Sequence, residues 1–121
     1  MSSGHSIQIS RSNAHVEVRL GGEVLASTDS ALRLEETGLP ARYYIPRKDV
    51  RMDRLVATSF QTTCPFKGQA SYWSAEVDGQ SRDGVVWSYQ TPKAEVREIK
   101  DMLSFYPDRT DVTVDGKPLR A

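Results

Sequence analysis

The sequence predicts a mainly β fold, organised as a single domain over residues 1–121 with one α-helix in the C-terminal half. Turn signals that contain Gly, Pro or Asp recur at short intervals and divide the chain into short strands, which is the all-β pattern. The chain has 121 residues, a common size for one domain. Hydrophobic residues make up 38% and charged residues 26%, which is typical of a globular protein and not of a disordered one.

The first half of the chain contains the clearest strand signals. Residues 15–20 alternate polar and apolar side chains, so the apolar ones are expected to face inward. Gly21 and Gly22 then close a two-residue hairpin. The strands that follow in this half are expected at residues 23–26, 31–36 and 41–45.

The second half begins with a charged connector, residues 47–54, which is expected to form a helical turn. Residues 64–68 are predicted to be a tight loop from their Pro and Gly content, and Asp78-Gly79 favours a hairpin turn. Strands are expected at residues 70–77, 85–89 and 111–114, and residues 55–63 are expected to hold one or two short ones.

The predicted helix spans residues 92–103. Thr91 suits the N-cap position and Pro92 suits the first helical position. Three apolar side chains recur at helical spacing and form a single stripe that would pack on the sheets. These side chains are Val96, Ile99 and Leu103.

The charge balance argues against a nucleic-acid partner. Lys and Arg number 16 and Asp and Glu number 16, so the formal net charge is zero, whereas a basic surface is the usual mark of a nucleic-acid binder. No apolar stretch approaches the ~20 residues that span a bilayer. The N-terminus also lacks the basic and apolar regions of a signal peptide. We therefore expect a cytoplasmic protein with no nucleic acid and no membrane among its partners.

The supply of metal ligands in the sequence is small. Cys64 is the single cysteine, and His5 and His15 are the only histidines. A cysteine-based zinc site needs more than one thiolate, and no ligand spacing brings the two histidines together. The sequence also lacks a phosphate-cradling Gly-rich loop, a dinucleotide fingerprint and a Gly-x-Ser-x-Gly elbow. We therefore expect neither a metal nor a cofactor.

Glu36 is the first candidate for a catalytic group. On an alternating strand it lies on the same face as Leu32 and Leu34, a face expected to point into the core or into a cavity. An inward carboxylate needs a partner or has a raised pKa, because burial disfavours its charge. Glu36 is therefore interpreted as a general acid or base, or as an anchor for a polar ligand. The alternative is structural, with Glu36 reaching water at the strand end or pairing with an arginine such as Arg42.

The loop at residues 64–68 supplies the second catalytic candidate, Lys67. It follows Phe66 in a tight loop, where a long cation reaches a ligand or acts as a base if it is desolvated. The alternative for Lys67 is an ordinary solvent-exposed lysine. Cys64 becomes a nucleophile only if the pKa of its thiol is lowered, and a simply buried thiol is the commoner situation.

Adjacent aromatic residues supply the candidate ligand-binding surface. Neighbours on a strand point to opposite faces, so one member of the Tyr43-Tyr44 pair and one of the Tyr72-Trp73 pair are expected to line a groove, an interface or a cavity. Aromatic walls with a few polar groups are the usual composition of small-ligand sites, whereas ordinary sheet packing is the alternative. The predicted ligand-binding residues are Tyr43, Tyr72, Trp73, Trp87 and Tyr106.

Several short motifs follow one another along nearly the whole chain, from about residue 4 to residue 116. They are residues 22–28 (GEVLAST), 34–38 (LEETG), 43–50 (YYIPRKDV), 63–68 (TCPFKG), 70–74 (ASYWS), 86–89 (VWSY) and 104–107 (SFYP). In order and spacing, this set resembles the bacterial and fungal family catalogued as domain of unknown function 427. The resemblance implies a compact, mostly antiparallel β domain with strongly curved sheets, barrel- or tent-like, and one helix.

The family's motif positions coincide largely with the candidates reached from the residues themselves. They fall on Glu36, Tyr43, Lys67, Tyr72, Trp73, Trp87 and Tyr106. Some catalogues give the family a nucleotidyltransferase-like label. This sequence shows no Gly-Ser plus paired-aspartate metal motif of that chemistry, so the label adds no functional expectation here.

The candidates lead to one functional expectation, a small-molecule site inside or at the mouth of a curved sheet. Aromatic side chains would line it, and Glu36 and Lys67 would supply the polar chemistry. As an enzyme, the protein is expected to perform cofactor-free acid/base catalysis on a small organic substrate, such as a cyclisation, isomerisation or hydrolysis. The alternatives are a non-catalytic ligand-binding module and a protein-interaction module. An antiparallel edge strand also allows two copies to pair as a homodimer.

Overall fold

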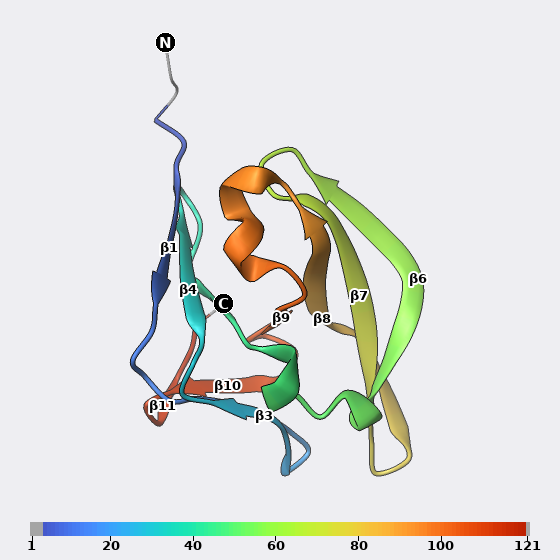
Figure 1. Cartoon of the computed structure of the whole chain (residues 1–121). Coiled ribbons are helices and arrows are strands. Elements are labelled where there is room, and N and C mark those ends of the chain that lie inside the picture. Colours follow the sequence, from blue (N-terminus) through green and yellow to red (C-terminus); the bar gives the residue numbers. More distant parts are fainter. Residues whose placement is uncertain (1–3, 121) are drawn as a thin grey trace.

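Three antiparallel sheets make up the structure, a computed structural model that describes residues 4–120 (Figure 1). The first sheet contains, in order, β1 (Ile7–Arg11), β4 (Leu32–Glu36) and β5 (Arg42–Tyr44). The second contains, in order, β11 (Lys117–Pro118), β10 (Asp111–Val114), β2 (Val16–Leu20) and β3 (Glu23–Thr28). The third contains, in order, β6 (Leu55–Cys64), β7 (Gly68–Val77), β8 (Gln80–Pro92) and β9 (Leu103–Phe105). Two short 3-10 segments, η1 (Arg47–Asp49) and η2 (Met52–Arg54), connect the first sheet to the third, and a third segment, η3 (Ala94–Ile99), lies between β8 and β9.

The arrangement of the sheets confirms the predicted mainly β, antiparallel fold class. The first sheet and the strongly curved third sheet face each other above the second, so the three form an open, tent-like arrangement (Figure 1). Among the described residues, no helix has the length and apolar composition needed to cross a membrane.

The hairpin of β2 and β3 follows the pattern predicted from the sequence. Val16, Val18 and Leu20 are buried and alternate with more exposed neighbours. Gly21 and Gly22 have positive φ angles of 59° and 82°, the backbone of a type I′ turn that matches the twist of the flanking strands. Apolar residues at every second position, followed by two glycines, were therefore sufficient to predict this hairpin.

Buried side chains form two separate clusters. The larger core includes Val16, Val18, Leu25, Ile45, Trp73 and Leu103. The smaller core consists of Leu34, Tyr44, Ala70, Trp87, Tyr89, Val96 and Ile99. Strand β8 belongs to both, because Val85 and Val86 lie in the larger core while Trp87 and Tyr89 lie in the smaller one.

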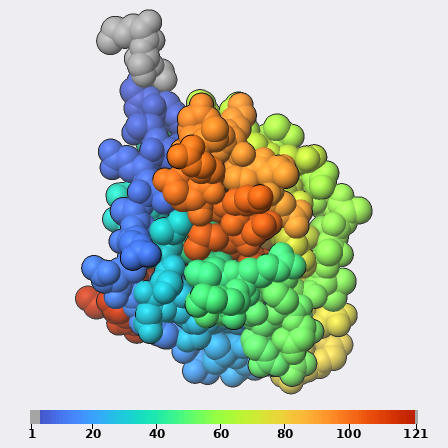
Figure 2. All heavy atoms as spheres, viewed as in Figure 1, coloured from blue at the N-terminus to red at the C-terminus, as the bar shows by residue number. Residues whose placement is uncertain are grey.

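The smaller core lies between the first and third sheets, and η3 covers it. Val96 and Ile99 of η3 are buried there beside Leu34 of β4, and Ile7 and Ile9 of β1 pack against the same cluster. Figure 2 shows this packing from outside, with the orange atoms of η3 next to the blue and cyan atoms of β1 and β4.

Residues 92–103 do not form the predicted α-helix. Pro92 is the last residue of β8, and Leu103 begins β9, where it exchanges backbone hydrogen bonds of 2.8 and 2.9 Å with Ile45. These pairings leave only η3, a 3-10 segment interrupted at Val96, where φ is −125° and ψ is 27°. The apolar spacing marked side chains that are buried, but strand pairing at both ends overrode the local helical preference.

The structure also contains three strands that the sequence did not predict, β1, β9 and β11. Strand β1 pairs with β4 from Ile7 opposite Glu36 to Arg11 opposite Leu32, so it forms the outer edge of the first sheet. The strand predicted at residues 85–89 is the middle of β8, which has 13 residues. Residues 55–63, expected to hold one or two short strands, belong to the single strand β6 with a register shift between Ala57 and Gln61.

Gly68 supports the turn from β6 into β7, and replacing it with alanine is expected to destabilise the fold by about 1–3 kcal/mol. Its φ is +115°, and an added Cβ would lie 3.3 Å from the Thr91 carbonyl oxygen and 3.5 Å from the Pro92 Cα. Gly79→Ala is the matched control, because Gly79 also has a positive φ of 73° but an added Cβ there meets nothing within 4 Å. Urea unfolding should show the larger loss for Gly68→Ala, and equal losses would contradict the steric explanation.

Candidate functional site

A cavity of about 230 Å³ opens between the first and third sheets, beside the smaller core. Its polar wall residues are Glu36, Arg42, Tyr44, Lys67, Tyr72, Tyr89 and Tyr106. Its apolar wall residues are Leu34, Leu39, Pro40 and Trp87. Strands β4 and β5 form one side, strands β7 and β8 form the opposite side, and Lys67 enters from the β6–β7 loop.

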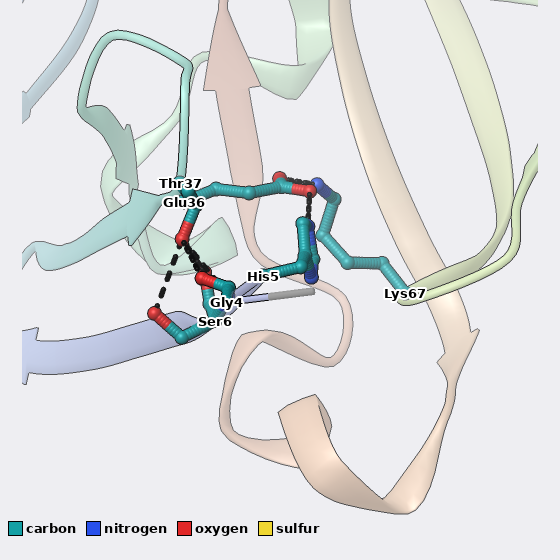
Figure 3. A network of polar contacts seen from close by, with 6 residues as sticks. All are labelled: Gly4, His5, Ser6, Glu36, Thr37 and Lys67. Atoms are coloured by element: carbon teal, nitrogen blue, oxygen red, sulfur yellow. Dashed lines mark hydrogen bonds and ion pairs between the residues drawn. The ribbon is translucent and has the colours of Figure 1, made fainter. Parts of the chain in front are cut away.

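Glu36 and Lys67 form an ion pair on the wall of this cavity (Figure 3). The Lys67 Nζ donates a hydrogen bond to the Glu36 Oε1, and the His5 Nε2 lies 3.0 Å from the Glu36 Oε2. The Lys67 side chain is 10% exposed and the Glu36 side chain 7% exposed, so the pair is nearly removed from bulk water. Glu36 therefore has charged and polar partners on both carboxylate oxygens.

Backbone contacts hold Lys67 in place. Its amide donates to the Cys64 carbonyl at 3.3 Å, and its own carbonyl accepts from the Lys93 amide at 2.9 Å. Gly68, with its positive φ, turns the chain directly after it. The ammonium is thus carried by a loop that is tied at both ends, as the predicted tight loop at residues 64–68 requires.

The N-terminal segment holds His5 against the carboxylate. Thr37, which follows Glu36, accepts a hydrogen bond of 2.9 Å from the Ser6 amide on its Oγ1 and donates its own amide to the Ser6 carbonyl at 3.0 Å. The His5 ring stacks on Phe66, with ring centroids 3.8 Å apart and an interplanar angle of 21°. His5 therefore contacts Glu36 (Figure 3) and also Phe66, the residue before Lys67.

Glu36 is ionised at neutral pH. Burial by itself would raise its pKa, but the hydrogen bonds from Lys67 and His5, together with their charges, outweigh burial and hold the pKa below its ordinary value of 4.5. Of the two situations foreseen for an inward carboxylate, the structure shows the one with a partner, and the partner is Lys67 instead of Arg42. The group is therefore placed to accept a proton.

Three phenols of the cavity wall, those of Tyr44, Tyr89 and Tyr106, keep their protons at neutral pH. Burial raises the pKa of Tyr44 and of Tyr89 far above the ordinary value of 10.0. Burial and a hydrogen bond with Tyr72 raise the pKa of Tyr106 to about 12. The Tyr44 hydroxyl accepts a hydrogen bond of 3.1 Å from the Trp87 Nε1. These hydroxyls are neutral groups that can donate a hydrogen bond to a bound molecule.

Most of the residues predicted for the site line this one cavity. They are Glu36, Lys67, Tyr72, Trp87 and Tyr106. Two others, Tyr43 and Trp73, do not line it and pack instead with the larger core. The reason is strand alternation: Tyr43 and Trp73 each adjoin a cavity residue, Tyr44 and Tyr72, and therefore point to the opposite face.

Several cavity residues were not among those predicted for the site. Tyr89 follows Trp87 by two positions on β8 and shares its face, which alternation along the strand could have indicated. Arg42 lies opposite Leu34 across the β4–β5 pair, a register that is visible only once the strands are paired.

Cys64 is a half-buried free thiol that packs against the smaller core and does not line the cavity. Among residues 4–120, no cluster of His, Cys, Asp and Glu gathers that could hold a metal ion.

A protein-family model matches residues 8–116, and its description is a domain of unknown function (DUF427). This match confirms the resemblance inferred from the sequence motifs. The matched range contains Glu36, Lys67 and the aromatic residues of the cavity wall, whereas His5 lies outside it. A comparison with curated proteins gives no match.

Proposed function

Since the chain belongs to the DUF427 family, a domain family of unknown function, we propose its role from its own cavity. The protein binds a small organic molecule there and acts on it by cofactor-free acid/base catalysis. The observation that carries this proposal is the Glu36–Lys67 ion pair, nearly removed from bulk water on the wall of an aromatic cavity.

The ion pair is hard to explain by stability alone. Moving two charges out of water costs about as much free energy as their attraction returns, and apolar side chains of similar volume often stabilise a fold equally well. Both side chains line the cavity, and the rest of the wall is mainly aromatic and apolar. A few polar groups in such a wall are the usual composition of small-ligand sites.

The protonation states favour a division of roles. Glu36, held ionised, accepts a proton from the bound molecule, and the Lys67 ammonium stabilises the negative charge that forms on it. A protonated phenol such as Tyr106 then gives a proton to another atom of the bound molecule, and the proton on Glu36 returns to the phenolate through solvent, which restores both groups. Together these steps move a proton within the bound molecule, which serves a cyclisation or an isomerisation without a cofactor; in a hydrolysis, Glu36 takes the proton from the attacking water and the phenol gives one to the leaving group.

The size of the cavity favours a small substrate. Its volume of about 230 Å³ lies below the range of roughly 300–1,000 Å³ that is common for drug-sized ligands. A nucleoside triphosphate is a poor fit for this volume, and the wall offers one carboxylate, Glu36, which is already paired. We also propose a cytoplasmic location, since Cys64 is a free thiol, as is usual in reducing compartments.

A second candidate function, protein interaction, is favoured by one observation on β6. This strand forms an edge of the third sheet, and its sequence LVATSFQTTC carries no charged residue. Val56 is 47% exposed and Phe60 is 62% exposed, whereas natural edge strands are commonly protected by charges. The partner in this candidate function is a second copy that pairs along β6 to give a homodimer, which sedimentation at rising concentration would detect.

Ligand capture tests the main proposal. The protein is incubated with a cell metabolite extract, and the retained molecules are identified by mass spectrometry. A captured molecule is expected to change the indole fluorescence in the Trp73→Phe variant, which keeps Trp87 in the cavity wall, and to have little effect in Trp87→Phe. Conversion of the captured molecule supports an enzyme, saturable binding without conversion supports a binding module, and no captured small molecule contradicts the proposal.

A further inference from the structure

The cavity wall carries one more positive charge than negative. Glu36 and Lys67 neutralise each other, and the phenols of Tyr44 and Tyr89 are uncharged at neutral pH. Arg42 remains as the cation without a carboxylate: within residues 4–120 its polar contact is a donation to the Ala41 carbonyl at 3.2 Å. A bound molecule therefore meets a wall with a net charge of about +1 at neutral pH.

The wall also offers more hydrogen-bond donors than acceptors. Tyr44 is 1% exposed, and its hydroxyl accepts from Trp87 but donates to no acceptor in the part of the chain that the structure describes. Tyr89 is 6% exposed, and its hydroxyl makes no hydrogen bond to a described residue but is not among the buried unpaired polar atoms, so it is accessible from the cavity that the residue lines. Both hydroxyls therefore have a proton to donate to a ligand that brings acceptor oxygens.

We propose that the substrate is a small monocarboxylate whose carboxylate is bound by Arg42 and by the hydroxyls of Tyr44 and Tyr89. This inference rests on the proposed function. A carboxylate supplies one negative charge, matching the wall, and its two oxygens suit the fork of a guanidinium. Arg42 and Tyr44 lie two residues apart on β5, so their side chains share one face of the strand, and both line the cavity. A phosphate dianion would leave a charge unmatched, and an amine would face Arg42 and Lys67 with the same sign.

Paired fragments test this inference on the full chain. Acetate, benzoate, phenylacetate and cinnamate are titrated beside their uncharged amides, and binding is followed by the NMR signal of the Trp87 indole N–H, which contacts Tyr44. At least one carboxylate is expected to bind about 10- to 100-fold more tightly than its amide, as is typical of hydrogen bonds to a charged group.

Variants assign the preference to Arg42. Arg42→Gln is expected to remove the 10- to 100-fold preference for the carboxylate and leave the amide affinity unchanged. Arg33→Gln is the matched control, because Arg33 lies one position away from the Leu34–Arg42 pair, alternates to the other face of the same sheet and pairs with Glu35 at 3.2 Å. It is expected to retain the preference.

The outcomes separate the two proposals. Amides that bind as tightly as the carboxylates, a preference that survives in Arg42→Gln, or tighter binding of phenylphosphonate than of benzoate would overturn the carboxylate assignment and leave the small-molecule function standing. No binding of either fragment series, together with no captured metabolite, would contradict both.

Discussion

Replacing Glu36 with glutamine is expected to lower turnover of the captured substrate by about 10²–10⁴-fold, the usual contribution of a positioned acid/base group. Glutamine keeps the size of the side chain and an oxygen that accepts from Lys67, but its amide does not take up a proton. Turnover is measured by mass spectrometry with saturating substrate, and circular dichroism establishes that the variant is folded.

The neighbouring position offers a matched control for this experiment. Glu35 lies on the same strand but is 51% exposed and pairs with Arg33, so Glu35→Gln should leave turnover within a factor of two or so, as surface changes usually do. Wild-type kcat/KM should fall in acid with a midpoint below pH 4.5, because the pKa of Glu36 lies below that value. A folded Glu36→Gln variant with an unchanged rate would remove Glu36 from the mechanism.

Replacing Lys67 with methionine is expected to destabilise the fold by about 3 kcal/mol, since breaking a buried pair leaves an uncompensated charge. The Glu36 carboxylate would keep only His5 as a partner while remaining 7% exposed. Urea unfolding measures the loss. Lys48→Met is the control: Lys48 also pairs with a carboxylate, that of Asp49 at 3.4 Å, but is 75% exposed, so the stability lost should be within about 0.5 kcal/mol.

The double variant Glu36→Gln/Lys67→Met distinguishes the charge effect from lost packing. With both charges removed, most of the stability lost in Lys67→Met should return, because no charge is left unpaired. A double variant as unstable as the sum of the single variants would show that packing, and not the ion pair, accounts for the loss.

The same pair predicts how stability depends on pH. The pKa of Glu36 is lower in the folded protein than in the unfolded chain, so the pair contributes its full stability above about pH 4.5. As pH falls below this value, the unfolded chain takes up the proton first, and the contribution is lost as pH falls through the pKa of the folded state. The acid midpoint of unfolding should therefore move in the Glu36→Gln variant, which has no carboxyl group at this position.

The fold was predictable where the signal was local. Alternation at residues 15–20 and the paired glycines after it are read from neighbouring residues, and the structure contains that hairpin. The helix predicted at residues 92–103 was wrong because a contact between distant segments determines the backbone there. The helical spacing of these residues is also local, but the backbone there follows from the pairing of Leu103 with Ile45, which are far apart in the sequence. Contacts between distant segments leave no periodic trace in either one.

The residues of the candidate site also differ in whether a local signal predicts them. Glu36 and Lys67 were found from residue type and position in a strand or loop, and the structure brings them together. Choosing between Tyr43 and Tyr44 required knowing which face of β5 is turned to the cavity, and that depends on the register of β5 against β4. His5 lies before the first strand, outside any pattern, so only the three-dimensional contact reveals it.

Strand β8 couples ligand binding in the cavity to the stability of the whole fold. Because it supplies side chains to both clusters, neither cluster can melt while the other keeps its full packing. A molecule that fills the cavity thus opposes global unfolding, and at 100 times its Kd it adds about 2.7 kcal/mol. That corresponds to a melting temperature higher by on the order of 10 °C for a domain of this size. Melting temperatures measured with and without each compound can therefore rank candidate ligands before any reaction is known.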